Sequence, residues 1–366
     1  MMIKEGKIGP HEAASLIIIT IITKVFLSSP RALTDYVGTA SWYTTMISAA
    51  TAAVGFGFIY LLIKRFPGKD LVQILQLALG SFIGGVLSLA LAGYLLFSAT
   101  IISRELIEAL KIFEYPLTPP DFILLFLGFG AFFPVYLGLE AISRMASLWF
   151  FIIIIGLLSI LLLAVPLYDV SNLFPILGYG LKKSISHGIS RSSAYGEVVI
   201  LAFLVNSLQG HKHFKRIGLY SILVSGALIS FSLFCYTLFR NYLVLKENTI
   251  PILSIARGIV YGRFFTRFEA IYIFVWALSS GICITVHLYS AITVFAKVIK
   301  VDDYKPLIYP FFTIYYSIGM FIPDFSSLLV LVQWTRGYGS LFFFAIPLLG
   351  LISSLVRRVK GGRLDA

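Results

Sequence analysis

The chain has 366 residues, of which 58% are hydrophobic and only 13% are charged, and its formal net charge is +12. A soluble domain has about 25% charged residues. This chain therefore has too few polar side chains to cover a water-facing surface, and we expect a polytopic integral membrane protein. The positive charge is interpreted as a determinant of topology and of contact with membrane lipid, because no basic tail indicates nucleic-acid binding.

The sequence also argues against an enzyme. It contains no Walker loop, HExxH motif or GxSxG motif, so no catalytic residue, metal site or cofactor is predicted. Cys235 and Cys283 both lie in apolar runs and are interpreted as small buried hydrophobic residues. The first apolar run has no small-residue cleavage site, which indicates a retained span and not a removed signal peptide.

Ten apolar runs are candidate membrane spans, since a span needs about 20 apolar residues. Charged and proline-containing segments such as KRFPGKD (64–70) and YPLTPPD (115–121) separate them. We interpret the whole chain, 1–366, as a single transmembrane domain with ten helices and both termini on one side. In chain order the candidates are 11–29, 41–63, 73–98, 122–139, 146–167, 194–209, 217–243, 268–296, 306–323 and 338–356.

The distribution of basic residues predicts the orientation. If the N-terminus is inside, the inner segments hold most of the lysines and arginines, from Lys4 to Arg363. The short outer loops then hold only Arg31, Arg104, Lys111 and Arg336. Because cytoplasmic loops are enriched in lysine and arginine, we expect both termini in the cytoplasm.

Two spans are imperfect, and they are the first spans of two five-span halves. Span 1 contains Thr20, Thr23 and Lys24, and span 6, AYGEVVILAFLVNSLQG (194–210), is short and ends in polar residues. Polar or short segments at matching positions in two halves indicate an inverted-repeat transporter with broken helices. We therefore predict breaks in helices 1 and 6. The first repeat covers about 8–168 and the second about 190–358.

Lys24 is the most costly residue in this arrangement. A charged side chain near the middle of a bilayer costs about 2.5–3.5 kcal/mol on insertion scales. A helix that starts near Pro10 places Lys24 about 21 Å along its axis, past the middle of a core of ~30 Å. Two interpretations remain open. Either Lys24 lies beside the helix break and binds a carboxylate or backbone carbonyls in place of a coupling cation, or its stem snorkels outward past Ser28 and Ser29.

Several segments resemble conserved parts of the endospore germination permeases, the B subunits of GerA-type germinant receptors in the amino acid–polyamine–organocation superfamily. They occur in order and at compatible spacing over about residues 60 to 325. The segments are RFPGKDLVQIL (65–75), GLEAISR (138–144), NLFPILGYGLKKSISHG (172–188), TIPILSIARGIVYGRFFTRFEAIYIFVWALSS (249–280) and DDYKPLIYPF (302–311).

This resemblance implies a LeuT-like 5+5 inverted repeat and recognition of a small germinant, such as an amino acid, in the spore inner membrane. It also implies an A-type membrane subunit and a C-type lipoprotein as partners. Relatives carry glycines at the span 1 break, whereas TIITKVF (20–26) has none, which leaves a shorter break or a different ligand as explanations. The alternative function is a proton-coupled amino acid transporter.

Candidate ligand-binding residues follow from the expected breaks and from this fold. Asn206 and Ser207 lie where the span 6 break is expected, and interhelical hydrogen bonding is the alternative role for them. By fold analogy alone, Tyr94 and Ser98 occupy the position where this fold closes an aromatic gate. The full set is Thr20, Thr23, Lys24, Tyr94, Ser98, Asn206, Ser207, Ser279 and Ser280, of which the last two are also interpretable as packing residues.

Further charged residues have competing interpretations. Glu197 either titrates in a water-filled vestibule or is solvated at the surface. Glu140 and Arg144, four residues apart, are predicted to form a helical ion pair, whereas Arg267 and Glu269 are predicted not to face each other. His211 and His213 are interpreted as part of a solvated basic loop.

Overall fold

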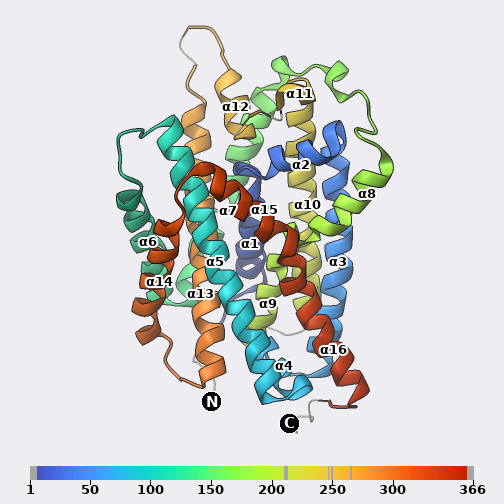
Figure 1. The fold of residues 1–366 in the computed structure, drawn as a ribbon, viewed down its shortest axis with the longest axis vertical. Coiled ribbons are helices and arrows are strands. Elements are labelled where there is room, and N and C mark those ends of the chain that lie inside the picture. Colours follow the sequence, from blue (N-terminus) through green and yellow to red (C-terminus); the bar gives the residue numbers. More distant parts are fainter. Residues whose placement is uncertain (1–5, 210–212, 246, 249, 264–265, 361–366) are drawn as a thin grey trace.

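The computed structural model describes residues 6–209, 213–245, 247–248, 250–263 and 266–360, and the elements assigned in them are helical (Figure 1). Within these residues, seven helices are long and apolar enough to cross a membrane. They are Ser29–Arg65, Ser81–Ile112, Pro120–Leu137, Leu139–Leu163, Phe214–Phe239, Glu269–Ile299 and Phe325–Val356.

The helices follow one another in an elongated bundle. The long ones are α3 (Ser41–Arg65), α5 (Ser81–Phe113), α6 (Pro120–Leu137), α7 (Leu139–Leu163), α10 (Phe214–Phe239), α13 (Glu269–Ile299) and α15 (Phe325–Ser340). Shorter elements are α14 (Ile308–Phe321), α16 (Ile346–Val356), α1 (Pro10–Ile22), η1 (Thr23–Phe26), α2 (Ser29–Val37), η2 (Gly38–Ala40), α4 (Leu71–Leu79), η3 (Val165–Leu167), η4 (Val170–Leu173), α8 (Leu181–Ser190), η5 (Arg191–Val199), α9 (Ile200–Phe203), η6 (Val205–Ser207), α11 (Tyr242–Leu245), α12 (Pro251–Gly258), η8 (Lys305–Leu307) and η9 (Leu341–Ala345).

Helix α1 lies in the centre of the bundle (Figure 1). Its residues from Ala13 to Ile22 are all buried, and it packs against α7, α10 and α13. A helix that is apolar all around its circumference must be enclosed on every side, which explains this position. Glu12 accepts a hydrogen bond from the Gly9 amide at 2.8 Å and so caps the start of the helix.

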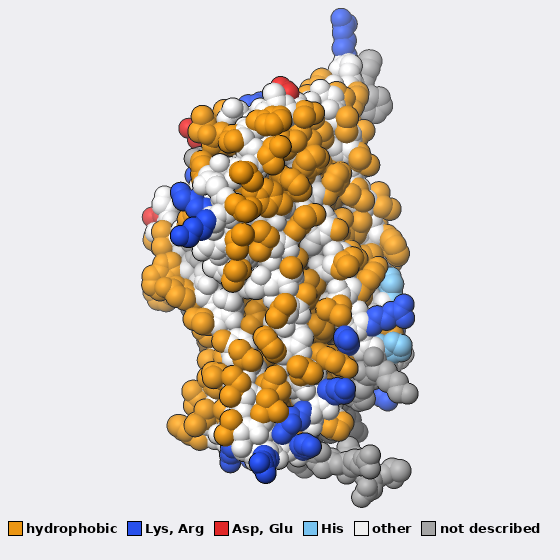
Figure 2. Space-filling view, turned by 90° about the vertical axis from the view of Figure 1, so that its right-hand side faces the viewer, with side chains coloured by type: hydrophobic (Ala, Val, Ile, Leu, Met, Phe, Trp, Pro, Cys, Tyr) orange, Lys and Arg blue, Asp and Glu red, His pale blue; other side chains and the backbone are white. Residues whose placement is uncertain are grey.

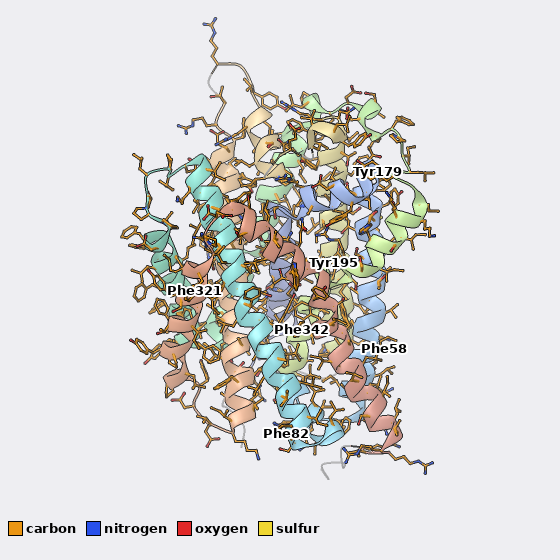
Figure 3. The ribbon with its side chains drawn as sticks, in the orientation of Figure 1. Phe58, Phe82, Tyr179, Tyr195, Phe321 and Phe342 are labelled. Atoms are coloured by element: carbon orange, nitrogen blue, oxygen red, sulfur yellow. The ribbon has the colours of Figure 1, made fainter. Side chains whose placement is uncertain are left out.

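The outer surface of the bundle is apolar. Phe58, Phe82 and Phe321 project outward, and Phe82 and Phe321 are 82% and 85% exposed, whereas Tyr195 is fully buried within the bundle (Figure 3). Hydrophobic side chains cover most of the face in Figure 2, and many lysine and arginine side chains gather towards its lower end. Large exposed apolar areas mark surfaces that contact something other than water, here the membrane.

The two ends of the described chain lie at the same end of the bundle (Figure 1). Near the start, Ile8 and Gln209 are joined by a backbone hydrogen bond of 2.9 Å. Near the other terminus, Arg65 at the end of α3 donates to the carbonyls of Ser354 and Val359, both at 2.9 Å.

The largest boundary errors fall in two of the predicted spans. Helix α5 runs to Phe113, 15 residues past the predicted end at 98, and the last span starts at Phe325 instead of 338. Arg104 and Arg336 therefore lie inside helices and not in outer loops. Their side chains are 3% and 11% exposed, and each is paired with a glutamate. Ion pairing lowers the cost of burying a charge, which a hydropathy scan does not register.

The two predictions about neighbouring charges had different outcomes. The pair of Glu140 and Arg144 is present at 3.6 Å and is largely exposed. The prediction for Arg267 and Glu269 was wrong, because they form an ion pair at 3.5 Å. Arg267 precedes the helix that begins at Glu269, so its backbone can bring the side chain back towards the helix start. His211 lies outside the described residues, and His213 is exposed.

Gly84 and Gly85 provide a matched test of how α4 packs on α5. A Cβ at Gly84 would lie 2.4 Å from the Leu75 carbonyl oxygen, whereas one at Gly85 would meet only Val298 at 3.7 Å. Backbone atoms cannot rotate away, so we expect Gly84→Ala to lower the free energy of unfolding by about 1–3 kcal/mol. Gly85→Ala should leave it unchanged or raise it slightly, because alanine favours the helix. Denaturant unfolding of both purified variants checks this, and equal stability would contradict it.

Candidate functional site

The first helix breaks at Lys24 without a glycine. Helix α1 ends at Ile22, and the chain continues as the 3₁₀ turn η1 over Thr23–Phe26. The Thr20 and Thr23 hydroxyls donate to the carbonyls four residues earlier, both at 2.7 Å, a contact that tends to bend helices. The Phe26 carbonyl, released by the break, accepts a hydrogen bond from Tyr272.

The second break is the 3₁₀ segment η5, which covers the nine residues Arg191–Val199. Runs of 3₁₀ helix longer than three or four residues are uncommon and often mark functional hinges. With three residues per turn, side chains at i, i+3 and i+6 lie on one face. This geometry lines up Arg191, Ala194 and Glu197 along the side of η5 that faces Lys24.

Lys24 and Glu197 form the centre of the site. The Lys24 ammonium lies 2.5 Å from the Glu197 carboxylate and also donates to the Ala194 carbonyl. Lys24 is 8% exposed and Glu197 is 4% exposed. The snorkelling interpretation of Lys24 and the solvated interpretation of Glu197 are therefore wrong. Each break supplies one member of a buried ion pair.

His287 on α13 extends this centre. Its Nε2 lies 3.9 Å from Glu197 Oε1. Its Nδ1 lies 2.8 Å from the Cys283 carbonyl, and because a carbonyl only accepts, Nδ1 carries the hydrogen. Nε2 has no hydrogen-bond partner among the described residues. In the neutral ring Nε2 is thus the acceptor nitrogen, and it faces the carboxylate across a gap that a shared proton would close.

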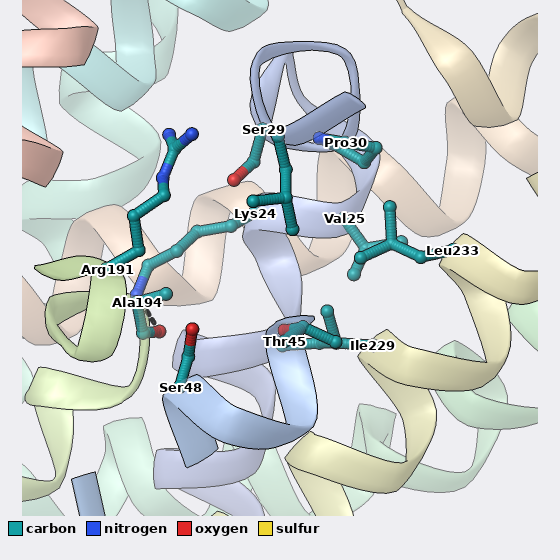
Figure 4. A pocket seen from close by; sticks show the side chains of 11 residues that line it. Lys24, Val25, Ser29, Pro30, Thr45, Ser48, Arg191, Ala194, Ile229 and Leu233 are labelled. Carbon is teal, nitrogen blue, oxygen red and sulfur yellow. Dashed lines mark hydrogen bonds between the residues drawn. The ribbon is translucent and has the colours of Figure 1, made fainter. Parts of the chain in front are cut away.

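Two small pockets meet at Lys24 and Ala194, with cavity volumes of about 30 and 40 Å³. Each has room for only a few water molecules in this conformation. One pocket is lined by Lys24, Val25, Ser29, Pro30, Leu33, Thr45, Ser48, Arg191, Ala194, Ile229 and Leu233. Figure 4 shows the Lys24 side chain reaching across this pocket to Ala194, with the Arg191 side chain nearby. The other pocket is lined by Lys24, Tyr94, Ser98, Ile101, Ile102, Glu105, Ser193, Ala194, Glu197, Thr335 and Arg336.

Helix α15 closes the second pocket. Tyr94 donates to the Thr335 carbonyl at 2.9 Å, and Ser193 donates to the Arg336 carbonyl at 2.5 Å. The Tyr94 ring also stacks on Phe342 with 4.6 Å between ring centroids. These contacts tie α15 and η9 to α5 and η5, so Ser98 inside the pocket is only 9% exposed.

Glu105 ties α15 to the first break. Its carboxylate accepts from the Ser28 hydroxyl at 2.5 Å and from Arg336 Nη2 at 3.1 Å. Ser28 immediately precedes α2. The carboxylate therefore joins α5, α15 and the chain just after η1 in one buried network.

Of the other predicted site residues, Thr23, Ser279 and Ser280 lie where the first break meets α13, whereas Asn206 and Ser207 lie away from the two pockets. Thr23 donates to the Ser279 carbonyl at 3.1 Å, so the first break packs directly on α13. The Ser280 hydroxyl is buried and has no hydrogen-bond partner among the described residues. Asn206 and Ser207 lie in η6, where Ile8 donates to the Ser207 carbonyl at 2.8 Å. Neither of them lines the two Lys24 pockets.

Four residues of the site were not predicted from the sequence: Glu105, Arg191, Arg336 and His287. A signal existed for Glu105, because apolar residues at helical spacing continue past Ser98 through Ile101, Ile102, Leu106 and Ile107. Arg191 gave no comparable signal. The described residues contain no group of three or more histidine, cysteine, aspartate or glutamate side chains that could hold a metal ion.

Comparison with solved structures identifies the fold. The chain is similar to Mhp1, a nucleobase-cation-symport-1 family transporter solved in a closed conformation with bromovinylhydantoin bound. The TM-score is 0.69 at 13% sequence identity, over 98% of this chain and 80% of the transporter. At this identity the similarity shows the fold alone, which is that of a LeuT-like transporter.

Comparison of sequences identifies the family. Spore germination protein A2 of Bacillus subtilis (strain 168) is 25% identical over 360 residues, 96% of this chain and 97% of the relative. Spore germination protein GerQB of Bacillus cereus is 23% identical over 357 residues, 96% of each chain. A family model described as "Spore germination protein" matches residues 7–324. The chain is thus an integral membrane protein that belongs to the spore germination protein family.

Proposed function

We propose that this protein is the membrane subunit of a spore nutrient-germinant receptor and that it binds a small germinant in the pockets around Lys24. The observation that carries the proposal is the meeting of both helix breaks at a buried ion pair, Lys24 with Glu197, beside two pockets. Polar backbone and charges inside a membrane are tolerated where they line a cavity. Family membership supports the role in germination.

The proposed architecture has ten spans in one domain. The seven long helices are joined by α1 with η1, by η5 with α9, and by α14, which are too short or too broken to count as continuous membrane helices. In a 5+5 repeat of about 8–168 and 190–358, the two broken elements take positions 1 and 6. The LeuT-like fold supports this arrangement.

The proposed orientation places both termini in the cytoplasm of the cell or of the spore core. In a variant that lacks Cys235 and Cys283, a cysteine at Gly68 should react only with thiol reagents applied from the cytoplasm. A cysteine at Lys183, on α8 at the other end of the bundle, should react only from outside. Labelling in inside-out and right-side-out vesicles checks this, and reaction of Gly68→Cys from outside would contradict the map.

A receptor needs its ligand to favour one conformation over another. A shift from 1:99 to 99:1 requires about 5.5 kcal/mol of differential affinity. In this proposal, the contacts that hold α15 over the pocket, through Tyr94, Ser193 and Arg336, are made in the closed conformation and broken in the open one. An A-type membrane subunit and a C-type lipoprotein are the proposed partners that receive this change.

Proton-coupled amino acid transport is the second candidate function. The observation that favours it is the 3.9 Å approach of His287 Nε2 to Glu197, next to the Lys24 ammonium. A proton passing between these groups would change the charge that faces Lys24 during each cycle.

Measurements on one purified preparation distinguish the two functions. We expect saturable binding of a small amino acid or related nutrient, slow or absent uptake into liposomes, and loss of the germination response in spores that lack the protein. Rapid accumulation of the ligand driven by a proton gradient would contradict the receptor function and support the transporter function. Because partner subunits belong to the proposal, binding is measured both for the protein alone and for the co-purified complex, and failure in both would refute it.

A further inference from the structure

The two pockets around Lys24 contain more positive than negative charge. The charged side chains that line them are three cations, Lys24, Arg191 and Arg336, and two carboxylates, Glu105 and Glu197. Lys24 pairs with Glu197, and Arg336 pairs with Glu105. Arg191 has no ion pair with a described residue, and its guanidinium lies over the Tyr36 ring at 5.7 Å. One positive charge is therefore left without a carboxylate in a buried site, which is an unstable arrangement without an anion.

The two arginines also have unused hydrogen-bond donors. Nη1 of Arg191 and Nη1 of Arg336 are both buried, and neither has a hydrogen-bond partner within the part of the chain that the structure describes. Buried donors in native proteins are nearly always paired. A guanidinium is not deprotonated in proteins, so both donors remain and each needs a hydrogen-bond acceptor.

The positions of these donors point to one region. Arg191 lines the first pocket and Arg336 lines the second, and the two pockets share Lys24 and Ala194. Arg191 belongs to η5, whereas Arg336 belongs to α15, which closes the second pocket. A group bound by both arginines would therefore link the second helix break to the closing helix.

We propose that Arg191 and Arg336 form an anion subsite beside Lys24 that binds a carboxylate of a ligand with net charge −1. This inference rests on the proposed function of the pocket. A guanidinium matches a carboxylate in shape and can hold it with two parallel hydrogen bonds. One negative charge balances the single excess positive charge, whereas a phosphate group, with about −1.5 to −2 charges, would overcompensate it.

The proposal makes a specific distinction between ligands of equal size. Propionate and propionamide have the same carbon skeleton and differ in charge. At constant ionic strength, propionate should slow the reaction of a thiol reagent with a cysteine at Ser98, in a variant that lacks Cys235 and Cys283, and propionamide should not. This comparison needs no change to either arginine, so it stands even if an arginine variant fails to fold.

Variants then assign the effect to the two arginines. Arg191→Gln should weaken the apparent affinity for propionate about 10- to 150-fold, the range of a charge-assisted hydrogen bond of about 1.5–3 kcal/mol. Arg191→Lys should recover part of it, because the charge returns without the planar fork. Arg267→Gln is the control, since Arg267 is 83% exposed at the side chain and lies outside both pockets.

The outcomes separate this proposal from the proposed function. Equal protection by propionamide, no protection by propionate, or unchanged affinity in Arg191→Gln would overturn the anion subsite. Protection of Ser98→Cys by a neutral nutrient in the same assay would still support the pocket itself. If no tested nutrient or propionate changed the labelling in the protein or in its complex, both proposals would fail.

Discussion

Replacing Lys24 with methionine is expected to lower the free energy of unfolding by about 3–5 kcal/mol, the cost of leaving one member of a buried ion pair without its partner. The ammonium contacts Glu197 at 2.5 Å, and neither side chain is more than 10% exposed. Its removal leaves a buried carboxylate whose remaining ion-pair partner among the described residues is His287, at 3.9 Å. Denaturant unfolding of the purified variant in lipid nanodiscs measures the effect.

A second variant and a control make this test specific. Lys24→Met combined with Glu197→Gln removes both charges and should recover most of the stability, because a neutral pair carries no charge-burial cost. Arg144→Gln breaks the exposed pair with Glu140 and should change stability by less than about 1 kcal/mol. A loss of less than about 1 kcal/mol in Lys24→Met would show that the ion pair contributes little.

Replacing Arg336 with glutamine is expected to open the second pocket. The variant loses the contact of 3.1 Å with Glu105 that holds α15 against α5. If this bond of about 1.5–3 kcal/mol exists only in the closed conformation, its loss raises the population of the open one about 10- to 150-fold. The rate of thiol labelling at Ser98→Cys, without Cys235 and Cys283, should rise by that factor.

The control for this second prediction is again an exposed ion pair. Arg267→Gln breaks the 3.5 Å contact with Glu269 and should leave the labelling rate at Ser98→Cys unchanged. An unchanged rate in Arg336→Gln would mean that the remaining contacts of α15, from Tyr94 and Ser193, are sufficient to keep the pocket closed.

Hydropathy predicted the spans whose charges lie at their ends. The runs 217–243 and 268–296 correspond closely to α10 (Phe214–Phe239) and α13 (Glu269–Ile299). It failed where charges are buried inside a helix, as in α5 beyond residue 98. A sliding average assigns the full cost of a charge to its own segment, whereas Arg104 and Glu105 are stabilised by partners elsewhere, including the Ile322 carbonyl and Arg336.

The part of the candidate site that the sequence predicted is the first helix break, because a single residue, Lys24, indicates it. Lys24 in an apolar run had to have a partner or reach the surface, so it identified the first break. Asn206 and Ser207 gave the strongest polar signal for the second break, and they lie in the 3₁₀ turn η6, whereas the residues that contact Lys24 belong to η5. Arg191, on the other hand, lines the pocket because η5 is a 3₁₀ helix with three residues per turn. A single sequence does not show whether these nine residues form a 3₁₀ helix or an α-helix with 3.6 residues per turn.

The same nine residues have a mechanical consequence. A 3₁₀ helix rises ~2.0 Å per residue and an α-helix ~1.5 Å, so conversion of Arg191–Val199 to an α-helix would shorten it by about 4.5 Å and turn its ends by roughly half a revolution. Since α8 runs directly into Arg191, this contraction would pull α8 towards the pocket. Spin labels on α8 and α10 would measure the change in distance. The segment that holds Glu197 against Lys24 is thus also an extensible connection between the pocket and α8.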